Sequence, residues 1–277
     1  ILGVSLEAPT SVSHYKILNL KKKIISKKID IRDLNKLKKT IKNFKPDYVF
    51  HLAAQSLVHK SYKTPLNTWS TNTIGTINVL ESLRELNNKC TAIIITSDKV
   101  YKNLETKRGY KENDLLGGID PYSASKASAE LAIHSYIKSY FSKYSKVKVG
   151  IARAGNVIGG GDWSPDRLIP DCIKSWSKGK TVSIRNPNST RPWQHVLEAL
   201  SGYLIFAINL KLNSKLHGEA FNFGPSQKNN YSVINLLKEC RKNWDKANWK
   251  IQESSHKLKF SESKLLSLNS NKSKKYL

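Results

Sequence analysis

Apolar and polar positions repeat along the first half of the chain with two alternating periods, one typical of helices and one typical of buried strands. Asp33 is a candidate helix cap, and the apolar positions that follow it at helical spacing are Leu34, Leu37, Ile41 and Phe44. Short apolar runs predict strands at residues 1–4, 48–54, 92–96 and 148–152. A long helix is expected after the second run, and another begins near Tyr122. Strands that alternate with helices indicate an α/β fold with a doubly wound parallel sheet.

From Val157 onward the pattern is less regular. The glycines at residues 159–161 predict a flexible turn, and the apolar positions of residues 168–176 predict a helix. Short strands and helices then alternate towards the end of the chain. We therefore expect two units, a larger sheet domain over residues 1–155 and a smaller lobe over residues 156–277 that is interleaved with it.

Length and cysteine content indicate a globular protein of a reducing compartment. The 277 residues are enough for one large domain or two modest ones. The sequence has no run of about 18 apolar residues, and its first residues do not have the pattern of a signal peptide. The cysteines, Cys90, Cys172 and Cys240, are widely spaced, which favours buried thiols over disulfides or a metal cluster. We expect a cytoplasmic protein without membrane association and without a metal site.

The formal net charge of +26 raises the question of a nucleic-acid partner, because clustered cations bind phosphates. Lysine supplies most of this charge, and the lysines are spread over separate segments alongside many Asn and Ile residues. Such a distribution is typical of solvated surfaces. We therefore expect no nucleic-acid partner, although the positive field would attract an anionic substrate.

Two short segments carry groups suited to proton transfer. Ser97, Asp98 and Lys99 directly follow a predicted strand, and Lys126 lies one helical turn after Tyr122. An ammonium at that position favours the phenolate, so a phenol with a pKa of ~10 becomes a usable general base at neutral pH. Ser97 would complete a Ser, Tyr, Lys proton relay that acts on an alcohol during hydride transfer. A buried tyrosine beside a solvated lysine is the other interpretation of the same spacing.

The remaining polar groups also admit two interpretations. Asp98 and Lys99 form either a solvated ion pair or an acid and a base that act on neighbouring carbons, as elimination of water requires. Residues 156–163 and 185–195 are rich in Gly, Asn, Arg and Trp, which fits ordinary loops with buried tryptophans or recognition of a nucleotide diphosphate. In the second interpretation the guanidinium of Arg191 pairs with phosphate oxygens.

Several longer motifs match one known family. The matching segments are residues 51–55, 96–101, 117–126, 152–163, 166–171 and 184–196. With these segments the chain resembles the extended short-chain dehydrogenase/reductases over essentially its whole length, and within that family the dehydratases that act on CDP-glucose. Lys99 is the discriminating residue, because family members that act on dTDP-glucose or GDP-mannose usually have Glu there.

The resemblance implies a Rossmann domain that binds NAD and a C-terminal lobe that binds the nucleotide sugar CDP-glucose. It implies that Tyr122 takes the proton of the sugar C4 hydroxyl while the C4 hydride leaves to NAD. Asp98 would then protonate the departing C6 hydroxyl, and Lys99 would help to remove the C5 proton. The implied product is CDP-4-keto-6-deoxy-D-glucose, with NAD regenerated. The implied cofactor contacts are Asp30, Ile31, Leu52, Ala53, Ala54, Asn72, Tyr122 and Lys126. The implied substrate contacts are Asn156, Arg167 and Arg191.

One departure from the family pattern concerns the start of the chain. The family begins with a strand and a glycine-rich loop, T-G-x-x-G-F-x-G, whose amides hold the cofactor pyrophosphate. This motif is absent from the sequence, and residues 1–10 resemble the second strand and the loop after it. Residues 273–277 resemble a point before the family's last helix. We therefore expect a chain that lacks about one βα unit at its start, is incomplete at both ends and binds NAD poorly by itself.

Two other functions stay open. Another nucleotide-sugar epimerase or dehydratase of the same fold would share Tyr122 and Lys126 but would not need Lys99. A catalytically silent protein that binds NAD or a nucleotide sugar is compatible with the absent glycine-rich loop. The resemblance also implies a homodimer or homotetramer, paired through a helix bundle that includes the Tyr122 helix.

Overall fold

Four parallel strands form the central sheet, in the order β10–β5–β4–β3. The computed structural model describes residues 1–142, 145–226, 229–252 and 264–277. The four strands are β3 (Tyr48–His51), β4 (Cys90–Ile95), β5 (Val147–Ala154) and β10 (Ala220–Phe223). Ile93 and Ile94 are adjacent in β4, and they are buried in two different core clusters. Both faces of the sheet are therefore covered, as a parallel sheet requires.

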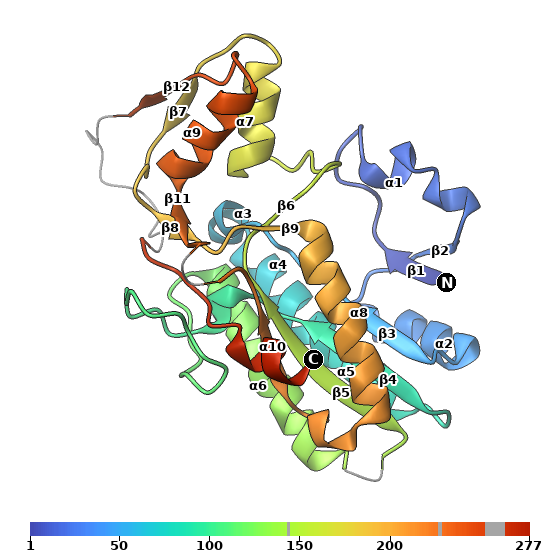
Figure 1. Ribbon diagram of the computed structural model, residues 1–277. Coiled ribbons are helices and arrows are strands. Elements are labelled where there is room, and N and C mark those ends of the chain that lie inside the picture. Colours follow the sequence, from blue (N-terminus) through green and yellow to red (C-terminus); the bar gives the residue numbers. More distant parts are fainter. Residues whose placement is uncertain (143–144, 227–228, 253–263) are drawn as a thin grey trace.

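A second parallel sheet holds the first two strands. The strands are β1 (Leu2–Ser5) and β2 (Ile25–Lys28), and they are connected by α1 (His14–Ile17) and a 3₁₀ turn (Leu20–Lys22). Among the described strands, β1 and β3 are not hydrogen-bonded to each other. Val4 of β1 and Val49 of β3 pack against the same core cluster, so the two sheets rest on a common layer of helices (Figure 1).

Three helices with apolar inner sides form that layer. They are α2 (Leu34–Phe44), α5 (Gly75–Arg84) and α6 (Pro121–Ser139). Asp33 caps α2, as the sequence predicted, and its carboxylate accepts a hydrogen bond from Lys36 N–H at 3.1 Å. Leu83 of α5 and Ile133 of α6 are fully buried in the cluster that covers this face of the sheet.

The long helix expected after β3 is divided into several pieces. They are α3 (Val58–Lys63), α4 (Pro65–Trp69), a π-helical turn (Ser70–Ile74) and α5. Thr64 has φ −134° and ψ 66°, because a residue that precedes a proline is disfavoured in a helix. The strand predicted over residues 48–54 ends at His51, and the N–H of Gln55 further on binds the side chain of Asn72 at 2.8 Å.

The opposite face of the central sheet is covered by α8 (Val196–Leu212). Phe206 of α8 packs edge to face on Phe221 of β10, with ring centroids 4.8 Å apart. Gly150 of β5 makes this approach possible, because a Cβ at that position would lie 2.4 Å from Phe206 Cζ. The sheet therefore has helices on both sides, which is the predicted doubly wound arrangement.

A smaller group of elements has a core of its own. It contains α7 (Leu168–Trp176), β7 (Val182–Ile184), α9 (Val233–Asn243) and β12 (Trp249–Ile251). Cys172, Trp176 and Leu237 are buried in this core, and β12 pairs in parallel with β7. Figure 1 shows these elements as a separate lobe beyond the strand ends of the main sheet.

Short strands and turns connect the lobe to the main sheet. The pairs are β6 (Val157–Ile158) with β9 (Gln194–His195), and β8 (Thr190–Arg191) with β11 (Tyr231–Ser232). The chain returns to the sheet through α8, a 3₁₀ turn (Ser214–Leu216) and β10, and α10 (Asn271–Tyr276) lies against β10. The sheet region and the lobe are thus interleaved in sequence.

The thiols lie inside the molecule and do not form disulfides. Cys90 and Cys172 are buried and Cys240 is half-buried, and all of them are free. Within the ranges that the structure describes, every helix is too short or too polar to cross a membrane. The same ranges contain no group of His, Cys, Asp and Glu side chains placed to hold a metal ion.

Candidate active site

The first turns of α6 carry polar side chains on the face that meets the sheet. Asp120 caps this helix, because its Oδ1 accepts hydrogen bonds from the N–H groups of Tyr122 and Ser123, each at 3.0 Å. Tyr122, Lys126 and Glu130 follow at intervals of four residues, and all three are buried. The prediction that Tyr122 and Lys126 share one helix face is therefore confirmed, and Glu130 extends that face.

Ser97 links Tyr122 to Asp98. Its hydroxyl donates to Asp98 Oδ1 at 2.9 Å and accepts from Lys99 N–H at 3.2 Å, so it caps the 3₁₀ turn Asp98–Val100. Burial raises the pKa of Tyr122 to about 12, and the hydrogen bond with Ser97 acts in the opposite direction. The strand end and the helix start thus bring the predicted serine and tyrosine into contact.

Lys126 binds the sheet. Its Nζ donates to the carbonyl of Ile95 at 3.2 Å. Burial lowers the pKa of Lys126 to about 8, and the charge of Glu130 acts in the opposite direction. The pKa of Tyr122 is raised in the chain by itself, because burial of the phenol outweighs the hydrogen bond with Ser97 and the charge of Arg167. The effect of the Lys126 ammonium on Tyr122 stays a prediction.

Asp98 is a buried carboxyl group that has one oxygen without a partner. Asp98 is 3% exposed, and its Oδ2 makes no hydrogen bond. Burial raises the pKa of Asp98, while the charges of Lys99 and Arg191 and the hydrogen bond from Ser97 act in the opposite direction. A carboxyl group with a raised pKa keeps its proton closer to neutral pH, which suits a general acid.

A buried ion pair that the sequence did not reveal anchors α6 to β5. Arg153 Nε donates to both carboxylate oxygens of Glu130, at 2.8 and 3.1 Å. Thr96 Oγ1 donates to Glu130 Oε2 at 3.0 Å, and Arg153 Nη1 donates to the hydroxyl of Tyr101 at 2.8 Å. These bonds hold α6, and Tyr122 with it, against the ends of β4 and β5. The sequence did offer one signal for Glu130, because it lies on the same helix face as Tyr122 at a spacing of eight residues.

The residues assigned to NAD lie mainly at the carboxyl ends of two parallel strands. Asp30 and Ile31 follow β2, and Leu52, Ala53 and Ala54 follow β3. The two alanines are partly exposed, and their small side chains leave the backbone accessible to a ligand. Because ligands of such sheets bind beyond the carboxyl ends of the strands, this edge fits NAD.

Two of the assigned cofactor residues are already engaged within the chain. Asp30 Oδ1 accepts from Arg32 Nε at 3.0 Å, and this hydrogen bond lowers the pKa of Asp30. Asn72 accepts from Gln55 N–H at 2.8 Å and donates to Gln55 O and to Ser125 Oγ at 3.0 and 2.9 Å. The structure thus gives Asn72 a positioning role between the end of β3 and α6. Its direct contact with the cofactor stays a prediction.

The residues assigned to the substrate come from three separate segments. Asn156 follows β5, and its carbonyl accepts from Gln194 N–H at 3.0 Å. Arg167 stands before α7, its Nη2 donates to Ser56 Oγ at 3.0 Å, and its Nε is buried without a hydrogen-bond partner. Arg191 of β8 is buried, and its Nη1 donates to the preceding backbone carbonyl at 2.7 Å.

Both arginines act electrostatically on the candidate catalytic groups Asp98 and Tyr122. The charge of Arg191 opposes the effect of burial on the pKa of Asp98, and the charge of Arg167 does the same for Tyr122. Arg167 Nε lies 3.9 Å from Asp162 Oδ2, and Arg191 Nη1 donates to a backbone carbonyl instead of a carboxylate. Guanidinium groups of this kind suit the recognition of phosphate oxygens.

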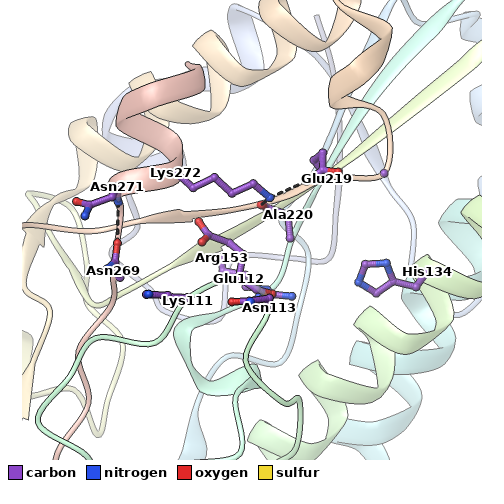
Figure 2. A pocket seen from close by; sticks show the side chains of 11 residues that line it. Lys111, Glu112, Asn113, His134, Arg153, Glu219, Ala220, Asn269, Asn271 and Lys272 are labelled. Carbon is purple, nitrogen blue, oxygen red and sulfur yellow. Dashed lines mark hydrogen bonds and ion pairs between the residues drawn. The ribbon is translucent and has the colours of Figure 1, made fainter.

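Two cavities lie near this region. The larger has a volume of about 620 Å³ and is lined by Lys111, Glu112, Asn113, His134, Arg153, Gly218, Glu219, Ala220, Asn269, Asn271 and Lys272 (Figure 2). It lies at the β10 edge, where Lys272 Nζ is paired with Glu219 at 2.6 Å. The second, of about 380 Å³, is lined by Lys99 and by residues 117–120 of the loop before α6. The second cavity is therefore the one that reaches the candidate catalytic residue Lys99.

Two solved structures have the same fold as this chain. The UDP-glucuronic acid 4-epimerase from Bacillus cereus, in complex with UDP-glucuronic acid and NAD, matches with a TM-score of 0.82 and 21% identity, over 100% of this chain and 84% of that one. The dTDP-glucose 4,6-dehydratase DesIV from Streptomyces venezuelae, with NAD bound, matches with a TM-score of 0.79 and 20% identity, over 99% and 80%. The predicted Rossmann-type α/β fold is confirmed.

Sequence comparison gives the family. The CDP-glucose 4,6-dehydratase of Salmonella typhimurium is 45% identical over 261 residues, which are 92% of this chain and 73% of that protein. The sequence profile of a family described as GDP-mannose 4,6 dehydratase matches residues 5–215. The chain therefore belongs to the GDP-mannose 4,6 dehydratase family, in which it is similar to the CDP-glucose dehydratase of Salmonella.

Proposed function

We propose that this chain carries the active site of a CDP-glucose 4,6-dehydratase, a hydro-lyase that uses NAD and forms CDP-4-keto-6-deoxy-D-glucose. The observation that carries the proposal is the position of Ser97 between Tyr122 and Asp98. It joins a group that can take a proton from an alcohol to a buried acid that can protonate a departing hydroxyl. The 45% identity to the Salmonella protein supports CDP-glucose as the substrate.

The first step is oxidation of the C4 alcohol. Ser97 orients the C4 hydroxyl, and Tyr122 accepts its proton. When bound at the strand ends that follow β2 and β3, NAD would supply the acceptor for the C4 hydride and the donor of a hydride to C6. Burial and the charges of Asp98 and Asp120 raise the pKa of Tyr122, so positive charge has to stabilise the phenolate during this step. Arg167 already contributes in that direction, and Lys126 lies on the same helix face.

The second step removes water across C5 and C6. The C4 ketone makes the C5 proton acidic, and the amine of Lys99 accepts that proton. Asp98 donates its proton to the C6 hydroxyl, which leaves as water when the C6–O bond breaks. The raised pKa of Asp98 favours the protonated form of this carboxyl group, which suits this step.

The two units of the chain divide the ligands between them. In this proposal the sheet domain of residues 1–155 binds NAD, and the lobe of residues 156–277 binds the nucleotide sugar. Arg167 and Arg191 would bind the diphosphate, and Asn156 would bind the sugar side of the substrate. This arrangement delivers the hexose to the strand end that carries Ser97 and Asp98.

The proposal includes a homodimer or homotetramer. α4 and the π-helical turn pack against α6, and this region exposes Leu66, Trp69, Ile74 and Leu131. An exposed apolar face of this kind is typical of a surface that a second copy covers. Light scattering should show a dimer or larger, and Leu131→Lys should shift the protein towards the monomer.

A cytoplasmic location fits the same proposal. The buried thiols of Cys90 and Cys172 suit a reducing compartment. The 4-keto-6-deoxy product is an intermediate from which a deoxysugar for a surface glycan, such as a lipopolysaccharide O-antigen, would be made.

Incubation of the protein with CDP-glucose and NAD tests the activity. Conversion to a 4-keto-6-deoxy product, seen by mass spectrometry as the loss of one water, supports the dehydratase. An epimer of unchanged mass would contradict it in favour of an epimerase. Unchanged sugar together with measurable NAD binding would contradict it in favour of a silent binding protein. Parallel reactions with dTDP-glucose and GDP-mannose test the specificity that we attribute to Lys99.

A further inference from the structure

Lys126 is a cation that is buried between α6 and the end of β4. Its Nζ donates one hydrogen bond, to the carbonyl of Ile95 at 3.2 Å. Within the described residues this amine forms no ion pair with a carboxylate. A buried ammonium that lacks a counter-charge loses its proton easily. Lys126 therefore needs support from a charge that lies further away if it is to remain an ammonium at neutral pH.

Glu130 lies where it can give this support. It is fully buried and follows Lys126 by one helical turn on the same face of α6. Burial lowers the pKa of Lys126 to about 8, and the charge of Glu130 acts in the opposite direction. His51 of β3 is close enough to be affected by the charge of Lys126, but burial lowers the pKa of His51 to about 3, so its imidazole is neutral at pH 7. Among the described groups, the charge that acts on the pKa of Lys126 is therefore that of Glu130.

Three side chains hold the carboxylate of Glu130 in its charged form. Arg153 of β5 donates from Nε to both oxygens at 2.8 and 3.1 Å, and Thr96, directly after β4, donates to Oε2 at 3.0 Å. His134, one turn further along α6, has its Nε2 3.7 Å from Oε1. Burial raises the pKa of Glu130, but these partners outweigh it and the pKa is lowered. The carboxylate is thus ionised and fixed in place from three elements.

We propose that Glu130 is a positioning residue for the reaction of Tyr122: its fixed carboxylate keeps Lys126 as an ammonium, which in turn favours the phenolate of Tyr122. The inference rests on the proposed function, in which Tyr122 takes the C4 proton. The three side chains lie on one buried face at intervals of four residues, so their charges alternate in sign when the phenolate forms. Each charge then stabilises its neighbour, and Glu130 acts on the reaction through Lys126 without touching the substrate.

Titration of Lys126 in the 277-residue chain tests the first half of this proposal. Lysine labelled with ¹³C at Cε reports the protonation of Nζ by nuclear magnetic resonance, and the Lys126 signal is the one that Lys126→Gln removes. In Glu130→Gln the pKa of Lys126 should fall by about one pH unit or more from its value of about 8. Thr96→Val is the matched control. It removes one hydrogen bond to the carboxylate but keeps the charge, so the pKa of Lys126 should stay within a few tenths of a unit.

A double variant keeps this test decisive if Glu130→Gln does not fold. Glu130→Leu combined with Arg153→Met replaces the buried ion pair with apolar side chains, a change that folds often tolerate. The pKa of Lys126 depends on the charge of Glu130 and not on that of Arg153, so the same fall is expected. An unchanged pKa of Lys126 in a folded variant without Glu130 would overturn the proposal. An equal fall in Thr96→Val would also overturn it, because packing rather than charge would then be responsible.

The pH profile of C4 oxidation tests the second half. Without Glu130 the amine of Lys126 loses its proton at a lower pH, so the rate should decline on the alkaline side at a pH that is lower by the same amount. A purely structural defect would instead lower the rate equally at every pH. An alkaline limb at the original pH, despite a lower pKa of Lys126, would exclude Glu130 from the reaction. A chain that oxidises no CDP-glucose at any pH would contradict the proposed function, whereas the titration of Lys126 needs neither NAD nor substrate and still decides the role of Glu130.

Discussion

Arg153 and Glu130 form a two-pronged ion pair in the interior, between β5 and α6. Burial by itself raises the pKa of Glu130, but the hydrogen bonds with His134, Arg153 and Thr96 and the charge of Arg153 outweigh it, so the pKa is lowered. Because α6 also carries Tyr122, this pair positions the proposed base without touching the reacting atoms.

Glu130→Gln tests how much the fold depends on this pair. The substitution keeps the size of the side chain but leaves Arg153 buried without its counter-charge. We expect the free energy of unfolding to fall by about 3–5 kcal/mol. Urea denaturation at neutral pH measures this loss. Lys242→Gln, which removes an exposed ion pair with Glu239, is the control and should leave the midpoint unchanged. Equal losses in both variants would contradict a special role for the buried pair.

The surroundings of Tyr122 show what local sequence pattern can and cannot predict. Helical spacing placed Tyr122 and Lys126 on one face of α6, and the strand-end rule brought Ser97 to them, because neither step needs side-chain detail. The raised pKa of Tyr122 depends on burial, which is set by packing between distant segments. The ion pair of Glu130 and Arg153 could not be predicted from local pattern for the same reason, since it joins α6 to β5.

The segment after β3 shows a different limit. Apolar periodicity predicted one long helix, yet Thr64 and Pro65 interrupt it and a π-helical turn follows at Ser70–Ile74. The proline was a usable signal, because the residue before it is disfavoured in a helix. The π-helical turn had no comparable signal. It places Asn72 where its amide can bind both Gln55 and Ser125.

His51 predicts a pH dependence of stability. It is buried at the end of β3, with Nε2 3.0 Å from Thr76 Oγ1. Burial lowers the pKa of His51 from 6.5 to about 3, and the charge of Lys126 acts in the same direction. Between these values the unfolded chain holds a proton that the folded chain does not, so stability falls as the pH drops below 6.5. One proton corresponds to a slope of about 1.4 kcal/mol per pH unit.

His51→Gln should remove the contribution of His51 to the pH dependence of stability. Denaturation curves recorded midway between pH 6.5 and about 3 should show a dependence that is flatter by about 1.4 kcal/mol per unit than in the unmodified chain. His14→Gln, at an exposed position, is the matched control and should keep the original slope. An unchanged slope in the His51 variant would show that another group is responsible.

Gly150 predicts an overpacking effect in the centre of the sheet. An alanine Cβ at this position would lie 2.4 Å from Phe206 Cζ, so Gly150→Ala should lower the free energy of unfolding by about 1–3 kcal/mol. In the double variant with Phe206→Leu the loss should be smaller than the sum of the two single losses, because the smaller ring-free side chain makes room. Gly160→Ala is the control: its Cβ would have no other atom within 4 Å, so the free energy of unfolding should not change. Additive losses would contradict this contact.

Tyr122→Phe removes the hydroxyl that would take the C4 proton. In the proposed reaction the rate of C4 oxidation, and of NADH formation with it, should fall by about 10²–10⁴. Single-turnover absorbance with CDP-glucose and NAD measures this step. Tyr140→Phe, an exposed tyrosine near the end of the same helix, is the control and should react normally. Normal oxidation in the Tyr122 variant would exclude this phenol as the base.

Lys99→Ala should separate the oxidation from the elimination. Ser97 and Tyr122 stay in place, so C4 oxidation proceeds, but the C5 proton loses its acceptor and the hydride cannot return to C6. Enzyme-bound NADH should therefore accumulate, which its near-ultraviolet absorbance reports. Lys102 lines the same cavity, so Lys102→Ala is the matched control and should turn over without accumulation. Absence of NADH in the Lys99 variant would contradict the role of that amine. Accumulation in both variants would attribute the effect to the charge of the cavity.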